Sequence, residues 1–143
     1  MSGFRKLTEN VSVSPQLALA DVAVAAAAGV AMIVNNRPDG EDPDAPQGAD
    51  IAAAAAAAGL NYVEIPIGHS GFSEPQVDAM IAALEQAEGP ILAYCRSGTR
   101  STLLWALATA KQGGNPDDIA RTAMQAGYDI SPIRAMVDML AAR

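Results

Sequence analysis

The residues best suited to chemistry surround Cys95, the only cysteine of the chain. A short apolar stretch at 90–94 precedes it, and the polar loop 96–101 separates it from an apolar helical pattern. A strand that ends in a sharp glycine-containing turn before a helix aims several backbone amides at one spot. That spot favours negative charge, so it stabilises a thiolate, and Arg100 adds a positive charge beside it. A lone cysteine is more often a small buried hydrophobic residue, but this pattern favours a nucleophile.

The rest of this loop supplies candidate ligands for the same negative charge. Gly98 allows a backbone turn with positive φ at no steric cost. Ser101 can hydrogen-bond the sulfur or cap the helix that follows. The remaining predicted anion-binding residues are Arg96, Ser97 and Thr99. Because alternate groups of such a loop must point away from its centre, we expect the Arg96 side chain to face outward.

Two further loops carry candidate supporting residues. Parallel strands bring their carboxyl ends to one crevice, so the loops after the second and third strands should meet the cysteine loop. Arg37 is either a second anion contact or a structural ion-pair partner of Asp39, Glu41 or Asp42. Asp39 is either an acid or a turn former ahead of a glycine. His69 is either an acid, base or substrate contact, or an exposed loop histidine.

The elements that must position these residues follow a βα pattern, in which short apolar runs alternate with alanine-rich helical stretches. This pattern predicts one α/β domain over residues 1–143, with a mostly parallel sheet flanked by helices. The predicted strands are 11–13, 30–35, 62–67 and 90–94. The predicted helices are 18–28, 50–58, 73–89, about 100–112, 116–126 and 132–142. Helical spacing places Trp105, Met124, Met136 and Met139 in the core.

Composition excludes several kinds of partner and cofactor. Nine basic against sixteen acidic side chains give a net charge of -7 and a pI near 4.4, so nucleic acid and anionic membranes are poor partners. One cysteine and one histidine supply neither a disulfide nor a structural zinc site. No stretch is apolar enough to span a membrane. We therefore expect a cytoplasmic enzyme that needs no cofactor and no metal.

Two resemblances follow from these residues. The loop from Tyr94 to Ser101 resembles the active-site loop of single-domain rhodaneses, which are thiosulfate or persulfide sulfurtransferases. The whole chain, from residues 4–7 through 35–41 to that loop, resembles the bacterial beta-lactamase hydrolase-like proteins. Their domain has a dual-specificity-phosphatase-like fold and occurs alone or fused to a persulfide dioxygenase. This resemblance implies the same fold here, catalytic roles for Cys95 and Arg100, and a persulfide dioxygenase as a partner.

The loop departs from the phosphatase pattern in ways that favour sulfur transfer. Cysteine phosphatases have Cys-x5-Arg, usually with histidine before the cysteine, whereas this chain has Cys-x4-Arg and Tyr94. Phosphatases of this fold also carry an aspartic acid upstream, and residues 65–73 contain none. We therefore expect Cys95 to take sulfane sulfur from thiosulfate or a small persulfide and to pass it to a thiol or cyanide.

Two alternatives stay open. In the first, the protein is a phosphatase in which Cys95 becomes a phosphocysteine, Arg100 holds the phosphoryl oxygens, and Asp39 or His69 supplies the proton. In the second, the loop binds an anion or a phosphorylated partner without catalysis.

Overall fold

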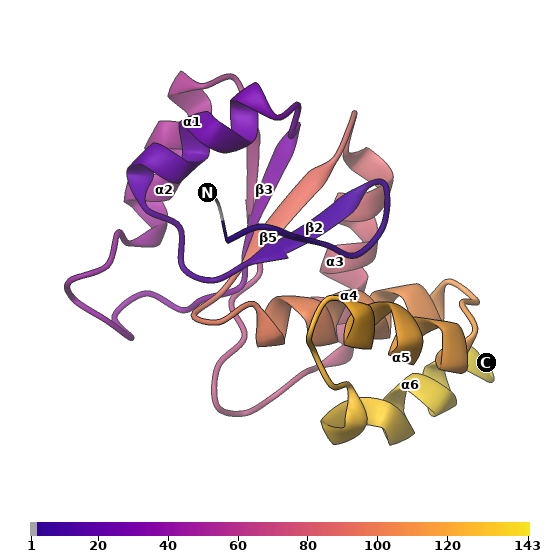
Figure 1. The fold of residues 1–143 in the computed structure, drawn as a ribbon. Helices are drawn as coiled ribbons and strands as arrows, with labels where there is room; N and C mark the ends of the chain where they lie inside the picture. The colour runs from indigo at the N-terminus through magenta and orange to yellow at the C-terminus, as the bar shows by residue number, and fades with distance from the viewer. Residues whose placement is uncertain (1–2) are drawn as a thin grey trace.

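A computed structural model describes residues 3–143 of the chain, which build one five-stranded sheet in the order β1-β2-β5-β3-β4 (Figure 1). The strands are β1 (Arg5–Lys6), β2 (Val11–Ser14), β3 (Met32–Asn35), β4 (Asn61–Glu64) and β5 (Ile91–Tyr94). Strand β1 is antiparallel to β2, and all other neighbouring pairs are parallel. The predicted α/β class with a mostly parallel sheet is confirmed.

Helices cover both faces of this sheet. They are α1 (Leu19–Ala27), α2 (Gly48–Ala57), α3 (Glu74–Gln86), α4 (Thr99–Lys111), α5 (Pro116–Gln125) and α6 (Arg134–Ala141), with a 3-10 turn, η1 (Ser131–Ile133). Helices α1 and α2 pack on one face, and α3 and α4 pack on the other, with α5 and α6 against α4 (Figure 1). None of the helices in residues 3–143 is long and apolar enough to cross a membrane.

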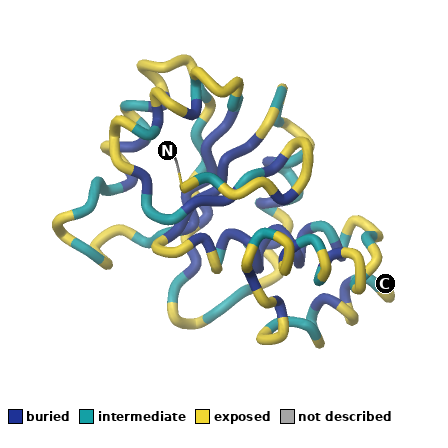
Figure 2. The backbone as a smooth tube through the Cα atoms, viewed as in Figure 1, coloured by how far each residue is buried: buried dark blue, intermediate teal, exposed yellow. Residues whose placement is uncertain are grey.

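The central strand β5 is buried on both faces, as a parallel strand between two helical layers must be (Figure 2). Successive side chains of a strand point to opposite faces. Leu92 and Tyr94 therefore pack with α1 and α2, whereas Ile91 and Ala93 pack with the larger cluster around α4. The strand that leads to Cys95 is thus held from both sides.

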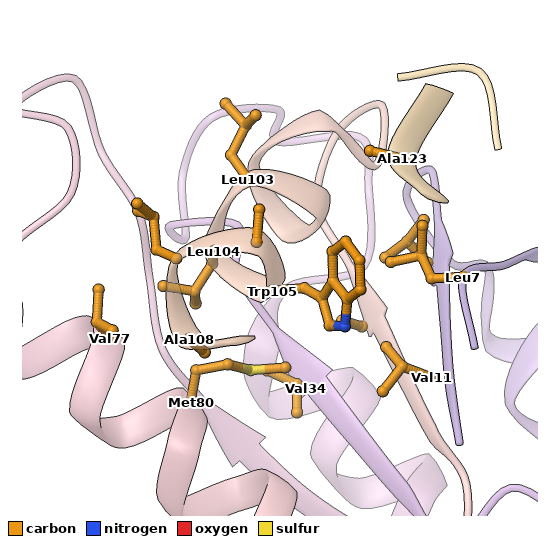
Figure 3. Close-up of a cluster of buried hydrophobic side chains, with 14 of the residues drawn as sticks. Leu7, Val11, Val34, Val77, Met80, Leu103, Leu104, Trp105, Ala108 and Ala123 are labelled. Atoms are coloured by element: carbon orange, nitrogen blue, oxygen red, sulfur yellow. The ribbon is translucent and has the colours of Figure 1, made fainter. Parts of the chain in front are cut away.

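Helix α4 is the most deeply buried helix, because it lies between the sheet and three other helices. All residues from 101 to 108 are buried. In Figure 3 the Trp105 indole lies toward Leu7 and Val11, while Leu104 and the neighbouring turn lie toward Met80 of α3. Small alanine side chains allow this close approach. The helix that begins at the cysteine loop is therefore fixed by packing along its length.

Several predicted boundaries shift. The two-residue strand β1 was not predicted, since its residues are exposed and charged. The strand predicted at 62–67 ends at Glu64, because Pro66 has no N–H to continue the ladder. Helix α2 begins at Gly48 rather than Asp50, and α3 ends at Gln86 rather than at Gly89. The predicted helix 132–142 is divided into η1 and α6.

The predicted core positions are confirmed only in part. Trp105 is buried, but Met124 and Met139 are 58% and 53% exposed. Helices α5 and α6 instead bury their other faces, through Ile119, Ala123, Val137 and Leu140. Helical spacing identifies residues that share a face, but it does not tell which face packs.

The packing of α4 predicts which leucine substitutions lower stability. Leu104→Ala removes a fully buried side chain from the main cluster, and we expect it to lower the free energy of unfolding by about 2–5 kcal/mol. Leu19→Ala, at a position 51% exposed on α1, should change it by less than about 0.5 kcal/mol. Urea unfolding followed by circular dichroism measures both. Equal losses for the two variants would contradict this account of the core.

Candidate active site

Three parallel strands end at the same level and hold the site at one edge of the sheet. The register pairs Tyr94 of β5 with Ser14 of β2 and with Asn35 of β3. Hydrogen bonds between the strands continue just beyond these residues. The Cys95 N–H donates to the Ser14 carbonyl at 3.4 Å, and the Asn36 N–H donates to the Tyr94 carbonyl at 2.8 Å. The loops after these strands therefore converge, as the sequence predicts.

Cys95 lies at the end of β5, one turn ahead of α4. Its side chain is fully buried, and its Sγ accepts a hydrogen bond from the Gly98 N–H at 3.1 Å. Gly98 has φ of +89° and precedes the first helical residue, Thr99. A residue with a Cβ adopts this conformation only under strain. The predicted strand–cysteine–glycine–helix arrangement is present, and an amide donor points at the sulfur.

Arg100, in the first turn of α4, is held by two other loops. Its Nη1 and Nη2 donate to the two carboxylate oxygens of Glu41 at 2.8 and 2.9 Å, and Nη1 also donates to the Ile67 carbonyl at 2.8 Å. The Glu41 carboxylate raises the pKa of Arg100, and the charge of Cys95 adds to this effect. The hydrogen bonds to Glu41 and Ile67 thus hold the guanidinium close enough to Cys95 for its charge to favour a thiolate or a bound anion.

Glu41 forms ion pairs with both Arg37 and Arg100. Besides Arg100, it accepts a hydrogen bond from the Arg37 Nε at 2.9 Å. These hydrogen bonds, that of Arg100 foremost, lower the pKa of Glu41 to about 2, so its carboxylate is ionised at neutral pH. The sequence predicts Glu41 only as an ion-pair partner of Arg37. Two features of the sequence point to this role. Glu41 follows Arg37 by four residues, and its loop must approach the cysteine loop.

Arg37 makes the ion pair that the sequence predicts as one of its two roles, and its role as an anion contact stays a prediction. Its guanidinium pairs with Glu41 and also donates from Nη1 to the Gln16 side chain at 2.9 Å. The side chain is only 10% exposed. Arg37 therefore helps to hold Glu41, and it reaches the substrate space only at the cavity wall.

An open cavity of about 520 Å³ lies over these groups. Its wall is formed by Arg37, Glu41, Asp42, Gly68, His69, Arg96 and Arg100. Three arginines against two acids leave this surface positive at neutral pH, on a chain whose net charge is -7. Arg96 is exposed as predicted, but it lines the cavity, and its side chain has no ion pair among residues 3–143. The exposed His69 side chain reaches the same space.

Asp39 and Asn36 hold neighbouring segments in place. The Asp39 carboxylate accepts the Gly48 N–H at 2.8 Å, at the first residue of α2. That contact agrees with the local structural role predicted for Asp39, and Asp39 does not line the cavity of Arg100. Asn36, which the sequence analysis passed over, donates from its side chain to the Ile65 carbonyl at 3.0 Å. It joins the loops that follow β3 and β4.

Unlike the Gly98 amide, the hydroxyl groups of the cysteine loop make no hydrogen bond to the Cys95 sulfur among the described residues. The Ser97 and Thr99 hydroxyls bind each other at 2.9 Å and are exposed. The Ser101 hydroxyl is buried and has no hydrogen-bond partner among the described residues. The prediction that Ser101 caps α4 is wrong, because Ser101 lies inside the first turn and Gly98 occupies the cap. The anion-binding roles of these three residues stay predictions.

Within residues 3–143, no group of three or more His, Cys, Asp or Glu side chains is placed to hold a metal ion.

The fold is that of the tyrosine and dual-specificity phosphatases, and Cys95 lies in the loop between its central strand and the helix that follows. Residues 3–112 match the phosphatase-like domain of the beta-lactamase hydrolase-like proteins. The chain belongs to this family. The likeness of the loop to that of rhodaneses stays a prediction.

Known proteins resemble the chain at two levels. A beta-lactamase hydrolase-like protein of Agrobacterium fabrum is 33% identical over 126 residues, which cover 87% of this chain but only 29% of that protein. A candidate phosphatase from Neisseria meningitidis, whose crystal structure is known, is 35% identical, with a TM-score of 0.85 and coverage of 98% and 99% of the two chains. Tk-PTP, solved in its active form, shares the fold at 16% identity, with a TM-score of 0.79 and coverage of 99% and 97%.

The ion pairs of Glu41 predict a pH-dependent contribution to stability. Because its pKa is lowered from about 4.5 to about 2 by folding, ionised Glu41 stabilises the folded state above pH 4.5, and this contribution disappears as the pH falls toward 2. Glu41→Gln should therefore be less stable than the unsubstituted protein at pH 7, and the difference should shrink steadily between pH 4.5 and 2. Urea unfolding at several pH values measures it. A difference that stays constant over this range would contradict the ion-pair account.

Proposed function

We propose that the chain is a sulfurtransferase in which Cys95 carries sulfane sulfur. The Cys95 thiolate attacks the outer sulfur of thiosulfate, the S–S bond breaks, and sulfite leaves with the electron pair. The persulfide on Cys95 is held by the loop amides and Arg100. An acceptor thiolate then attacks the outer sulfur, which regenerates the Cys95 thiolate and forms a new persulfide. A small persulfide can replace thiosulfate as the donor, with a thiolate as the leaving group.

The observation that carries this proposal is that the acids in this region already have partners. The Glu41 carboxylate is ionised between Arg37 and Arg100, the Asp42 carboxylate accepts the Asp44 N–H at 2.9 Å, and the Asp39 carboxylate accepts the Gly48 N–H. We infer that none of them is a ready proton donor for an alkoxide. Sulfite and thiolates leave without a proton, because they are stable anions. The step that this site catalyses most readily is therefore one whose leaving group departs as an anion.

A second candidate function is phosphate monoester hydrolysis. The family description and the candidate phosphatase from Neisseria meningitidis support it. In this reaction Cys95 attacks phosphorus, the ester oxygen leaves as an alcohol, and water later cleaves the phosphocysteine. The proton for the alcohol would come from His69, which lines the cavity with Arg100.

The partners follow from the chemistry of sulfur transfer. The donor is a small sulfur anion, and the acceptor is a thiol. A persulfide dioxygenase would consume the persulfide product, which makes this class of enzyme the proposed protein partner.

A mass measurement separates the two reactions. We expect thiosulfate to add 32 Da to the intact protein, and cyanide or glutathione to remove it, while aryl phosphate hydrolysis stays slow. Cys95→Ser should abolish the adduct, and it is a clean control because the chain has one cysteine. Cys95-dependent phosphate release without any sulfur adduct would reject sulfur transfer and support the phosphatase.

Substitution of His69 provides an independent test. If sulfur transfer is the function, His69→Asn should change its rate by less than about threefold, because no step needs a proton from this residue. If phosphate hydrolysis is the function, the same variant should lose about 10² to 10⁴ in kcat, as expected for removal of a general acid. Asp39→Asn serves as the matched control, since Asp39 lies outside the cavity of Arg100. Loss of sulfur transfer in His69→Asn alone would overturn the proton-free scheme.

A further inference from the structure

The peptide bond between Ser97 and Gly98 makes hydrogen bonds in two opposite directions. Its N–H, from Gly98, donates to the Cys95 Sγ at 3.1 Å. Its carbonyl, from Ser97, accepts the Tyr128 hydroxyl at 3.0 Å. In a trans peptide the C=O and N–H point to opposite sides of a rigid plane. A group that binds the Ser97 carbonyl therefore also keeps the Gly98 N–H pointing at the sulfur.

Tyr128 is itself held firmly. It follows α5 and is only 7% exposed. The Arg5 guanidinium of β1 lies 5.2 Å from the centre of its ring, and Arg5 Nη1 donates to the Ala126 carbonyl at 3.1 Å. Burial raises the pKa of Tyr128, so its hydroxyl stays protonated at neutral pH and remains a donor. Two segments remote from the cysteine loop thus fix this hydroxyl.

The loop needs such an anchor because Gly98 leaves the peptide free to turn over. Gly98 has φ of +89°, and a glycine accepts negative φ equally well. If the peptide turned over, the Ser97 carbonyl would face the sulfur, and the sulfur would lose its amide donor. The Tyr128 hydroxyl would also lose its acceptor. A β-carbon at position 98 would collide with this hydroxyl, which shows how closely the loop rests on it.

We propose that Tyr128 is a positioning residue for Cys95, and that its hydroxyl keeps the Ser97–Gly98 peptide in the orientation that stabilises the thiolate. This inference rests on the proposed role of Cys95 as a nucleophile, but not on which group Cys95 transfers. Tyr128 does not line the cavity, and its hydroxyl donates to the Ser97 carbonyl rather than to Cys95.

The test is the pH profile of Cys95 alkylation by iodoacetamide, followed by intact mass. Alkylation needs no substrate, and the single cysteine makes the signal specific. Tyr128→Phe keeps the ring beneath Arg5 and removes only the hydroxyl. We expect its alkylation rate at pH 7 to fall about tenfold and its profile to move to higher pH, since a hydrogen bond to a charged group is lost.

The matched control is Tyr62→Phe. The Tyr62 hydroxyl also makes two hydrogen bonds, to Glu64 at 2.6 Å and from Asn35 at 2.9 Å, but none to the cysteine loop. This variant should alkylate within twofold of the unsubstituted protein. Thermal unfolding shows whether each variant folds. If Tyr128→Phe did not fold, Arg5→Gln, which leaves the hydroxyl but removes the stacked cation, should still slow alkylation.

A direct readout is the Gly98 amide resonance in a ¹⁵N–¹H spectrum recorded across the same pH range. It should follow the ionisation of Cys95 in the unsubstituted protein and respond much less in Tyr128→Phe. Unchanged alkylation and an unchanged Gly98 response in a folded Tyr128→Phe would overturn the proposal. A protein that transfers neither sulfur nor phosphate would remove the proposed function but leave these two readouts intact.

Discussion

The bidentate ion pair between Arg100 and Glu41 joins the segments from which the site is built. Arg100 belongs to the buried helix α4, and Glu41 to the exposed loop after β3, 59 residues earlier. The Ile67 carbonyl ties the loop after β4 to the same guanidinium. An arginine side chain is long and flexible, so three fixed acceptors remove most of its freedom before a substrate binds. The guanidinium is therefore oriented before an anion reaches it.

The same pair restricts the chemistry that the site can support. A carboxylate between two arginines remains charged, so it shapes the field around the sulfur but does not donate a proton. It also removes part of the positive charge that a phosphate dianion would otherwise meet. The surplus cation at the cavity wall is Arg96, next to the nucleophile. A chain of net charge -7 thus keeps a small positive surface at this cavity.

Local signals in the sequence predicted the centre of the site, and contacts between distant segments supplied the rest. The apolar strand, Cys95 and Gly98 are neighbours in the chain, so their geometry follows from strand, turn and helix chemistry. Glu41 and Tyr128 reach the loop across 59 and 31 residues, and no periodicity reports such contacts. The same limit explains the fold-level corrections. Whether Met124 faces the core depends on how α5 docks, which its own sequence does not specify.

Glu41 and Tyr128 connect the cysteine loop to residues outside it. One fixes the guanidinium from the side of the substrate cavity, and the other fixes the Ser97–Gly98 peptide from the opposite side of the loop. The guanidinium and the Gly98 amide are then held in place before negative charge appears at the sulfur, which is the condition under which dipoles stabilise an anion most. A short loop places few hydrogen-bond donors around its sulfur. The loss of one donor therefore removes a larger fraction of the stabilisation than it would in a longer loop. Retention of the Cys-x4-Arg pattern alone would therefore not preserve the reactivity of Cys95.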